Sequence, residues 1–265
     1  MIYKIISKVI ANQLKPLLPT LLSEEQTSYV EGRQILDNII QAHEMVHSLI
    51  TNRQEIMIMQ LDIVQARDKL SWSYIRAILK TYGFDHNWIK WVMVLVTTDD
   101  CSILLNGAPS KTFKPSRGLR QGDPLSPFLF ILTMEGLGKA IRAAKEEGRI
   151  QGFRLTHGGD TMTHQQFVDD TMLQGTPTVK EAKAFKQILS EFARAAGTEL
   201  SLNKSKIFCN IDISIQRNLS RILGFQRESL PMKYLGVPLT NKPLHKDIWE
   251  PVLNKIKDKI RKWKK

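Results

Sequence analysis

The sequence predicts an α+β fold, in which short strands pack against longer amphipathic helices. Three observations predict it. Apolar residues recur at helical spacing in several long segments. Residues 56–61 form a largely apolar run of strand length, and residues 165–173 have the pattern of two short strands around an acidic turn. We therefore expect one folded unit with a sizeable core, because neither an internal repeat nor a linker interrupts the chain.

The first half begins with an amphipathic helix over residues 1–18 that ends near Pro16 and Pro19. Its apolar stripe consists of Ile2, Ile5, Ile6, Val9, Ile10 and Leu14. A polar connector, 23–34, leads to a second helix over Ile35–Leu49. The run 56–61 then predicts a buried strand that ends at Asp62, and a helix over Ser73–Tyr82 follows.

The second half contains a hairpin turn at Asn106-Gly107 and then a loop over residues 117–127. That loop opens a long helix over Ser126–Glu147, for which we predict Ser126 as the N-cap and Pro127 as the first helical residue. A helix over Val179–Ala196 follows the acidic turn. A basic amphipathic helix reaches Lys265.

The chain is strongly basic. Of its 265 residues, 38 are Lys or Arg and 26 are Asp or Glu, so the formal charge is 38 − 26 = +12. Ordinary hydrophobic content (42%) excludes a disordered protein, and the charge points to a polyanionic partner. No apolar run reaches the length of a membrane span, so we expect nucleic acid rather than a bilayer. Cys101 and Cys209 show no disulfide or zinc spacing, which favours an intracellular protein.

The residues most suited to a catalytic role are Asp62 at a strand end and the Asp169-Asp170 pair at a turn. Two-metal phosphoryl transfer needs hard carboxylate oxygens around two Mg²⁺ ions. Each signal by itself has an ordinary explanation. An Asp-Asp turn is more often a solvated hairpin, and Asp62 could be a helix N-cap.

The order of the motifs resembles that of reverse transcriptases, with the closest likeness to the plant LINE-type, non-LTR retrotransposon enzymes. Three segments carry the resemblance: Asp62-Ile63-Val64-Gln65-Ala66-Arg67-Asp68, Arg117-Gly118-Leu119-Arg120-Gln121-Gly122-Asp123-Pro124-Leu125-Ser126-Pro127, and Phe167-Val168-Asp169-Asp170. Similar short segments occur at 3–8, 32–35, 106–107 and 234–239, so the likeness runs almost end to end. The central string is highly specific, and the aspartates are diagnostic only beside it.

The resemblance implies a right-hand polymerase fold, with a palm of antiparallel sheet and packed helices, partial fingers and a missing thumb. Residues 1–54 would be mostly fingers, and residues 55–240 mostly palm with a fingers insertion near 101–122. Residues 241–265 would begin the thumb. The chain would thus be a fragment of a reverse transcriptase domain, whose longer parent polyprotein is expected to include an endonuclease region.

The implied reaction is RNA-directed DNA polymerisation, in which a primer 3′-hydroxyl attacks a deoxynucleoside triphosphate (dNTP). Its partners would be an RNA template, a DNA primer and dNTPs, without a membrane, and the active protein would be nuclear. The resemblance assigns two Mg²⁺ ions to Asp62, Asp169 and Asp170. It assigns the nucleotide to Arg33, Ile63, Arg67, Gln121, Gly122, Lys204 and Lys206, and the primer to Tyr234, Leu235 and Gly236. Ordinary alternatives are a solvated turn arginine for Arg33, solvated loop charges for Lys204 and Lys206, and a packed core residue for Tyr234.

Several positions depart from the family pattern. Arg67 stands where these enzymes carry Phe or Tyr, whose ring excludes a 2′-hydroxyl, and a flexible cation offers no such wall. Gln165 and Gln166 replace apolar residues in the strand before Asp169, where an unpartnered buried amide costs about 1 to 3 kcal/mol. Glu31 replaces a proline. An alternative function is therefore a truncated, catalytically impaired retroelement remnant that at most binds nucleic acid. A third reading, an unrelated basic domain, requires the motif order to be accidental.

Overall fold

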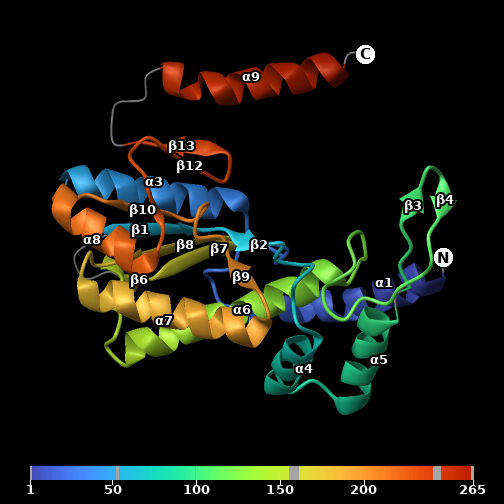
Figure 1. Cartoon of the computed structure of the whole chain (residues 1–265). Coiled ribbons are helices and arrows are strands. Elements are labelled where there is room, and N and C mark those ends of the chain that lie inside the picture. The colour runs from blue at the N-terminus through green and yellow to red at the C-terminus, as the bar shows by residue number, and fades with distance from the viewer. Residues whose placement is uncertain (1, 52–53, 99, 155–160, 241–245, 264–265) are drawn as a thin grey trace.

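The computed structural model describes residues 2–51, 54–98, 100–154, 161–240 and 246–263. Its centre is a five-stranded sheet with helices on both faces (Figure 1). The strand order is β11 (Gln226–Arg227), β10 (Lys206–Cys209), β1 (Met57–Leu61), β8 (Asp170–Gly175) and β7 (His164–Phe167). All neighbouring strands are antiparallel except β10 and β11, which are parallel. The strand predicted before Asp62 and the two strands predicted around the acidic turn are thus confirmed.

Alternation along β1 divides the core into two layers. Met57, Met59 and Leu61 belong to the larger core, which α6 (Ser126–Glu146) and α7 (Val179–Ala196) cover. Ile58 points to the opposite face, into a smaller core that contains residues of α3 (Ile35–Thr51) and of the hairpin β12 (Met232–Tyr234) and β13 (Val237–Leu239). Successive side chains of a strand point to opposite faces, so a strand that is apolar at nearly every position is buried on both.

The other elements surround these layers. They are α1 (Ile2–Leu14), the 3₁₀ turn η1 (Lys15–Leu17), α2 (Leu18–Leu21), β2 (Ile63–Val64), α4 (Trp72–Thr81), α5 (His86–Thr97), β3 (Leu104–Leu105), β4 (Ala108–Pro109), β5 (Phe153–Arg154), β6 (Thr161–Met162), β9 (Glu199–Leu200), α8 (Ile213–Leu223) and α9 (Lys246–Trp263). The hairpin predicted at Asn106-Gly107 is confirmed, since β3 and β4 pair around it and both turn residues have positive φ. The helix α5, whose N-cap is Asp85, was not predicted from the sequence.

The apolar stripe predicted for the first helix is largely wrong. The helix forms, but its buried face consists of Ser7, Ile10, Ala11 and Leu14. Ile2, Ile5, Ile6 and Val9 are 73%, 60%, 47% and 52% exposed. The small side chains of Ser7 and Ala11 let the helix pack closely on that face, and this choice leaves the larger apolar residues outside.

The start of α6 also differs from the prediction. Leu125 is the N-cap and provides no side-chain hydrogen bond, and Ser126 is already helical. Asp123 caps the first turn instead: its Oδ2 accepts hydrogen bonds from the main-chain N–H groups of Leu125 (3.0 Å) and Ser126 (3.1 Å). A carboxylate at this end satisfies free N–H groups and also complements the helix dipole.

Gln165 and Gln166 lie in β7 and are 1% and 0% exposed. Their amide nitrogens donate to Gln41 Oε1 (2.7 Å) and to the Met134 carbonyl (3.3 Å), respectively. Each amide oxygen is without a hydrogen-bond partner among the described residues. The predicted cost of these two amides is therefore confined to their oxygens.

The predicted C-terminal basic helix corresponds to α9, which contacts β13 and extends away from the sheet (Figure 1). Its predicted last two residues, and residues 241–245 of the expected thumb segment, lie outside the described residues. Within the described part of the chain, no helix is both long and apolar enough to span a membrane. The assignment of segments to fingers, palm and thumb stays a prediction.

Candidate active site

Asp62, Asp169 and Asp170 lie at the same end of the central sheet. Leu61 pairs with Thr171 across β1 and β8, so Asp62 follows one member of this pair and Asp170 precedes the other. On the other side of β8, Phe167 pairs with Asp170, which leaves Val168 and Asp169 as a two-residue turn. Two neighbouring antiparallel pairings thus bring Asp62 together with two carboxylates that are more than 100 residues away in sequence.

The pKa of the Asp170 carboxyl depends on its surroundings. Burial raises its pKa above the ordinary value, and the negative charges of Asp169 and Asp62 raise it further. Tyr234 responds to the same charge: burial raises the pKa of its hydroxyl, and so does Asp170. The sheet end is therefore a concentration of negative charge, and a bound cation would relieve its repulsion.

The turn that carries Asp169 has an unusual backbone. Val168 has φ +59°, in the left-handed region that β-branched residues rarely adopt. Its side chain is 8% exposed and belongs to the larger core, so burial of the side chain offsets a conformational cost of about 1 to 3 kcal/mol. The buried valine holds the turn in one conformation and, with it, the two aspartates that follow.

The loop after β9 supports Asp62 through the main chain. The N–H of Asp62 donates to Ser205 Oγ (3.1 Å), and the Asp62 carbonyl accepts from the N–H of Ser201 (2.8 Å). Ser205 is completely buried. Neither serine was predicted as a site residue, because no local sequence pattern distinguishes a buried serine that supports a site from a solvated one.

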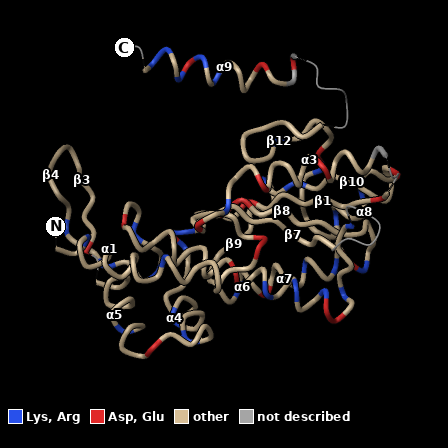
Figure 2. The backbone as a smooth tube through the Cα atoms, turned by 180° about the vertical axis from the view of Figure 1, so that it is seen from behind, with Lys and Arg blue, Asp and Glu red and all other residues tan. Residues whose placement is uncertain are grey.

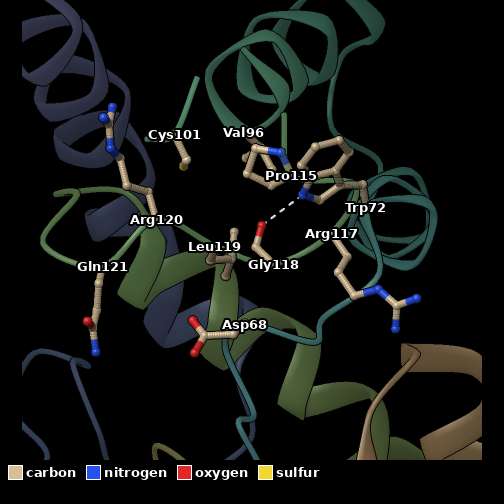
Figure 3. A pocket seen from close by; sticks show the side chains of 10 residues that line it. All are labelled: Asp68, Trp72, Val96, Cys101, Pro115, Arg117, Gly118, Leu119, Arg120 and Gln121. Atoms are coloured by element: carbon tan, nitrogen blue, oxygen red, sulfur yellow. Dashed lines mark hydrogen bonds between the residues drawn. The ribbon is translucent and has the colours of Figure 1, made fainter. Parts of the chain in front are cut away.

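Gly118 joins the loop before α6 to the segment after β2. Its N–H donates to the Leu70 carbonyl (2.8 Å), and its carbonyl accepts from Trp72 Nε1 (2.7 Å, Figure 3). The N–H of Leu119 adds a bond to the Arg67 carbonyl (2.9 Å). These contacts fix the base of the loop that bears Gln121 and Gly122, both of which are exposed.

The same loop borders a pocket of about 320 Å³ (Figure 3). Arg117, Arg120 and Gln121 lie at its lining, together with Asp68 and Cys101. Arg67 is not among the lining residues: its guanidinium lies over the Phe130 ring, with Cζ 5.7 Å from the ring centroid. The cation is therefore held against an aromatic of α6.

Arg33 has a structural role in this structure. Its guanidinium donates to the carbonyls of Leu22 (3.1 Å), Gln26 (2.7 Å) and Ser23. Two of its three nitrogens are thus engaged within the connector that precedes α3. This contact matches neither the solvated arginine nor the triphosphate ligand of the sequence analysis, and the nucleotide contact stays a prediction.

The remaining residues predicted to bind the nucleotide differ in their exposure and in their existing contacts. Ile63 is buried and pairs with Leu200 between β2 and β9. Lys204 is exposed in the loop that supports Asp62. Lys206 forms an ion pair with Glu228, so its ammonium already has a partner. Of the two lysines, only Lys206 is in an ion pair with a described residue, and Lys204 lies in the loop whose main chain contacts Asp62.

Of the predicted primer residues, Tyr234 ends β12, and Leu235 and Gly236 form the turn that leads to β13. Leu235 and Gly236 have φ +45° and +90°, which makes a two-residue hairpin with Gly236 exposed at the tip. Tyr234 is 4% exposed, belongs to the smaller core, and accepts a hydrogen bond from Asn38 Nδ2 (3.5 Å). This placement favours the packed-core alternative for Tyr234 and leaves the tip of the hairpin for a ligand.

The three aspartates fit Mg²⁺ in the chemistry of their donors. They offer only hard carboxylate oxygens, and the pKa of Asp170 is raised first by burial and then by the charges of Asp169 and Asp62. No group of three His, Cys, Asp or Glu side chains among the described residues is already arranged around a common point at metal-binding distances. The backbone brings these carboxylates to one sheet end without orienting them as a finished ligand set.

Comparison with known proteins gives consistent results. Residues 1–239 match the family model described as reverse transcriptase (RNA-dependent DNA polymerase). A 149 kDa protein of transposon TX1 from Xenopus laevis is 24% identical over 238 residues, which are 90% of this chain and 18% of that protein. The Pol polyprotein of the type-2 retrotransposable element R2DM from Drosophila melanogaster is 28% identical over 174 residues, 63% of this chain and 16% of that protein. This chain therefore spans less than a fifth of the length of either relative.

Solved telomerase structures share the fold. Telomerase from Candida albicans, in complex with a fragment of telomeric RNA, superposes with a TM-score of 0.60 at 13% identity and covers 89% of this chain and 36% of that one. Apo telomerase from Candida tropicalis gives a TM-score of 0.60 at 12% identity, over 92% of this chain and 41% of that one. The predicted right-hand polymerase fold is confirmed. Since the family match includes nine-tenths of its residues, the chain belongs to the reverse transcriptase family, and its retrotransposon relatives are of the non-LTR type.

Proposed function

We propose that this chain carries out RNA-directed DNA synthesis, adding deoxynucleotides from dNTPs to the 3′-hydroxyl of a DNA primer on an RNA template. The observation that supports this most directly is the meeting of Asp62, Asp169 and Asp170 at one sheet end in a chain of the reverse transcriptase family. Clustered carboxylates would repel a triphosphate and a nucleic-acid primer unless cations bound between them. The arrangement therefore supports phosphoryl transfer that depends on metal ions.

In the proposed site, these three carboxylates would hold two Mg²⁺ ions. Bound Mg²⁺ would neutralise charge on the triphosphate and favour ionisation of the primer hydroxyl. The protein's own contribution is positional. Buried Val168 fixes the acidic turn, and Ser201 and Ser205 fix the main chain of Asp62. Geometry held in this way lowers the entropic cost of aligning primer and nucleotide.

The loop that follows Gly118 would contact the incoming nucleotide through Gln121 and Gly122. Both residues are exposed, and space around Gly122 is open, so a base or sugar could approach the backbone closely. Lys204 would neutralise the leaving pyrophosphate from the opposite loop. The exposed tip at Leu235 and Gly236 would contact the primer.

The second candidate function is a binding remnant with impaired catalysis, and Arg67 favours it. A guanidinium stacked over Phe130 replaces the flat ring expected under the sugar. Its charge would also alter how a triphosphate binds nearby. The remnant would keep nucleic-acid binding through the +12 charge of the chain and lose efficient incorporation.

Primer extension on an RNA template tests the proposal. The purified 265-residue chain is incubated with a DNA primer, labelled dNTPs and Mg²⁺, and a parallel reaction contains a chelator. Extension that depends on Mg²⁺ and disappears in the Asp169→Asn variant is the expected result. Template binding without any extension, in protein that is folded by circular dichroism, would contradict polymerisation and support the remnant.

The relatives extend well beyond the region that they share with this chain, and their names describe retrotransposon Pol polyproteins. We propose that this domain acts as one part of such a polyprotein, alongside an endonuclease region. An antibody against residues of this domain would then detect a product much larger than 30.3 kDa in cells that express the element.

A further inference from the structure

The groove between α4 and α5 is a concentration of positive charge that the proposed active site does not use. Its volume is about 330 Å³, and four of its lining residues are Arg76, Lys80, His86 and Lys90. Arg76 and Lys80 are four residues apart on α4, and His86 and Lys90 are four apart on α5, so each pair shares one helix face. Three cations, Arg76, Lys80 and Lys90, thus line the same groove with the imidazole of His86.

No carboxylate balances this charge within the described part of the two helices. None of the four residues takes part in an ion pair with a described Asp or Glu. The only acidic residue between Lys69 and Thr98 is Asp85, whose Oδ1 caps α5 by accepting from the N–H groups of Asn87 (2.8 Å) and Trp88 (3.2 Å). The like charges of Arg76 and Lys80 at this spacing weaken α4, and a bound anion would reduce their repulsion.

The groove has a firm floor. Ile89 and Met93 line it and are each 4% exposed, because they pack into the larger core. Thr97 also lines it. The cationic groups therefore stand on a packed surface at the rims of the groove, an arrangement that suits the backbone of an extended polyanion more than a compact buried anion.

An exposed aromatic residue lies on the neighbouring surface of α5. Trp91 follows Lys90 directly and is 58% exposed. It lines a second, apolar groove with Ile6 and Val9 of α1, and Val94 lies in the walls of both grooves. A strand whose phosphates follow the basic groove could place a base on this indole, and stacking on aromatic rings is how proteins bind single strands without sequence preference.

This surface is separate from the acidic sheet end. Figure 1 shows α4 and α5 on the other side of α6 from the central sheet, and Figure 2 shows basic residues in both helices from the opposite direction. We propose that the α4–α5 groove is a second nucleic-acid site, which binds the phosphodiester backbone of a single strand outside the polymerase centre. Charge complementarity selects the ligand, and the chain's membership in a nucleic-acid polymerase family places such strands nearby.

Salt-dependent binding tests this site. Fluorescence anisotropy measures the affinity of the full chain for a fluorescein-labelled 20-nucleotide RNA, and for DNA of the same sequence, from 50 to 300 mM KCl without Mg²⁺ or dNTPs. The groove variant is Arg76→Gln/Lys90→Gln. The matched control, Lys183→Gln/Arg217→Gln, removes one Lys and one Arg that are exposed on α7 and α8.

The groove variant should bind about tenfold more weakly at 100 mM salt. The slope of the logarithm of the association constant against the logarithm of the salt concentration should become less negative by about 1.4, because each of the two lost phosphate contacts on a single strand contributes about 0.7. The control should match the parent in both quantities. Equal losses for RNA and DNA identify the backbone as the ligand, and a loss for only one identifies which strand the site prefers. Trp91→Ala should weaken binding without changing the salt slope.

Equal binding by the groove and control variants would overturn the proposal. So would a groove variant that loses binding only to phosphatidylserine vesicles, because the ligand would then be a membrane. A second variant, Lys80→Gln/His86→Gln, covers the case in which the first is less stable by thermal melting, and it should reproduce the weaker binding. Adding Asp169→Asn to the groove variant should leave the loss of binding caused by the groove substitutions unchanged, so a failure of catalysis and a failure of this site give different results.

Discussion

Gly118 and Asp68 approach each other so closely that a Cβ on Gly118 would lie 2.5 Å from the main-chain oxygen of Asp68. Gly118 also has φ +92°, which side chains rarely tolerate. The loop that bears Gln121 is thus held against the segment that follows Asp62 by a contact available only to glycine. This contact couples two of the segments that carry the family resemblance.

Replacing Gly118 with alanine should therefore destabilise the protein by at least about 2 kcal/mol, because the main chain of Asp68 must move to accommodate a methyl group. Urea unfolding followed by circular dichroism measures the change. Gly83→Ala is the matched control: Gly83 has φ +77° with no heavy atom within 4 Å of the added Cβ. Its cost should be only that of the positive φ, about 1 kcal/mol. Equal losses in the two variants would show that the close approach to Asp68 contributes nothing.

Removal of the Asp62 charge should lower the pKa of Asp170 toward its ordinary value. Asp62 is one of two neighbours whose negative charge raises that pKa, and the Asp62→Asn side chain has nearly the same shape. NMR titration of carboxyl-labelled aspartate measures it in the metal-free protein. Asp68→Asn serves as the control and should leave the titration of Asp170 in place. An unchanged Asp170 titration in the Asp62 variant would mean that the two carboxylates do not interact.

Substitution of Arg67 by tyrosine should increase deoxynucleotide incorporation and reduce ribonucleotide incorporation. The ring would offer the flat wall that a guanidinium lying over Phe130 does not. Single-nucleotide primer extension with dNTP and NTP gives both rates, and the Asp169→Asn variant should be inactive with Arg67 or with tyrosine at this position. If the Arg67→Tyr protein discriminates no better than the parent, position 67 does not set sugar selection.

Acid should destabilise the fold through His164. This residue is completely buried, and desolvation lowers its pKa from 6.5 to about 4, although the nearby Glu25 carboxylate opposes the shift and Arg142 and Lys145 add to it. The unfolded chain takes up the proton near pH 6.5, before the folded chain does. The contribution of His164 to the free energy of unfolding is therefore fully present above pH 6.5. It is lost as the pH drops toward 4, by about 1.4 kcal/mol per pH unit.

Urea unfolding at several pH values between 4 and 7 measures this slope. His164→Gln lacks the titrating ring, so its free energy of unfolding should depend less steeply on pH. The difference in slope should correspond to the uptake of at most one fewer proton on unfolding. The comparison removes the contributions of other groups, because they titrate in both proteins. Parallel pH profiles for parent and variant would show that His164 takes up its proton equally in the folded and unfolded states.

The sequence by itself determined most elements and the pairs of segments that carry chemistry. Local signals suffice for these. Apolar runs of strand length predict β1, helical periodicity predicts α3 and α7, and Asn106-Gly107 predicts a hairpin, because each depends on neighbours within a few residues. The motif string at residues 117–127, together with the three aspartates, was enough to identify the family that the comparisons then showed.

Tertiary structure decided which side chains are buried and which partners they have. Periodicity alone favoured Ile2, Ile5 and Ile6 as the core face of the first helix, but Ser7 and Ala11 are buried because small residues allow closer packing. Likewise, the sequence suggested a phosphate ligand at Arg33, but its guanidinium donates hydrogen bonds to main-chain carbonyls of residues 22–26. These carbonyls lie within reach of Arg33 only after the connector folds. Hydrogen-bond partners distant in sequence, such as Ser205 for Asp62, leave no local pattern, and only the packed fold selects them.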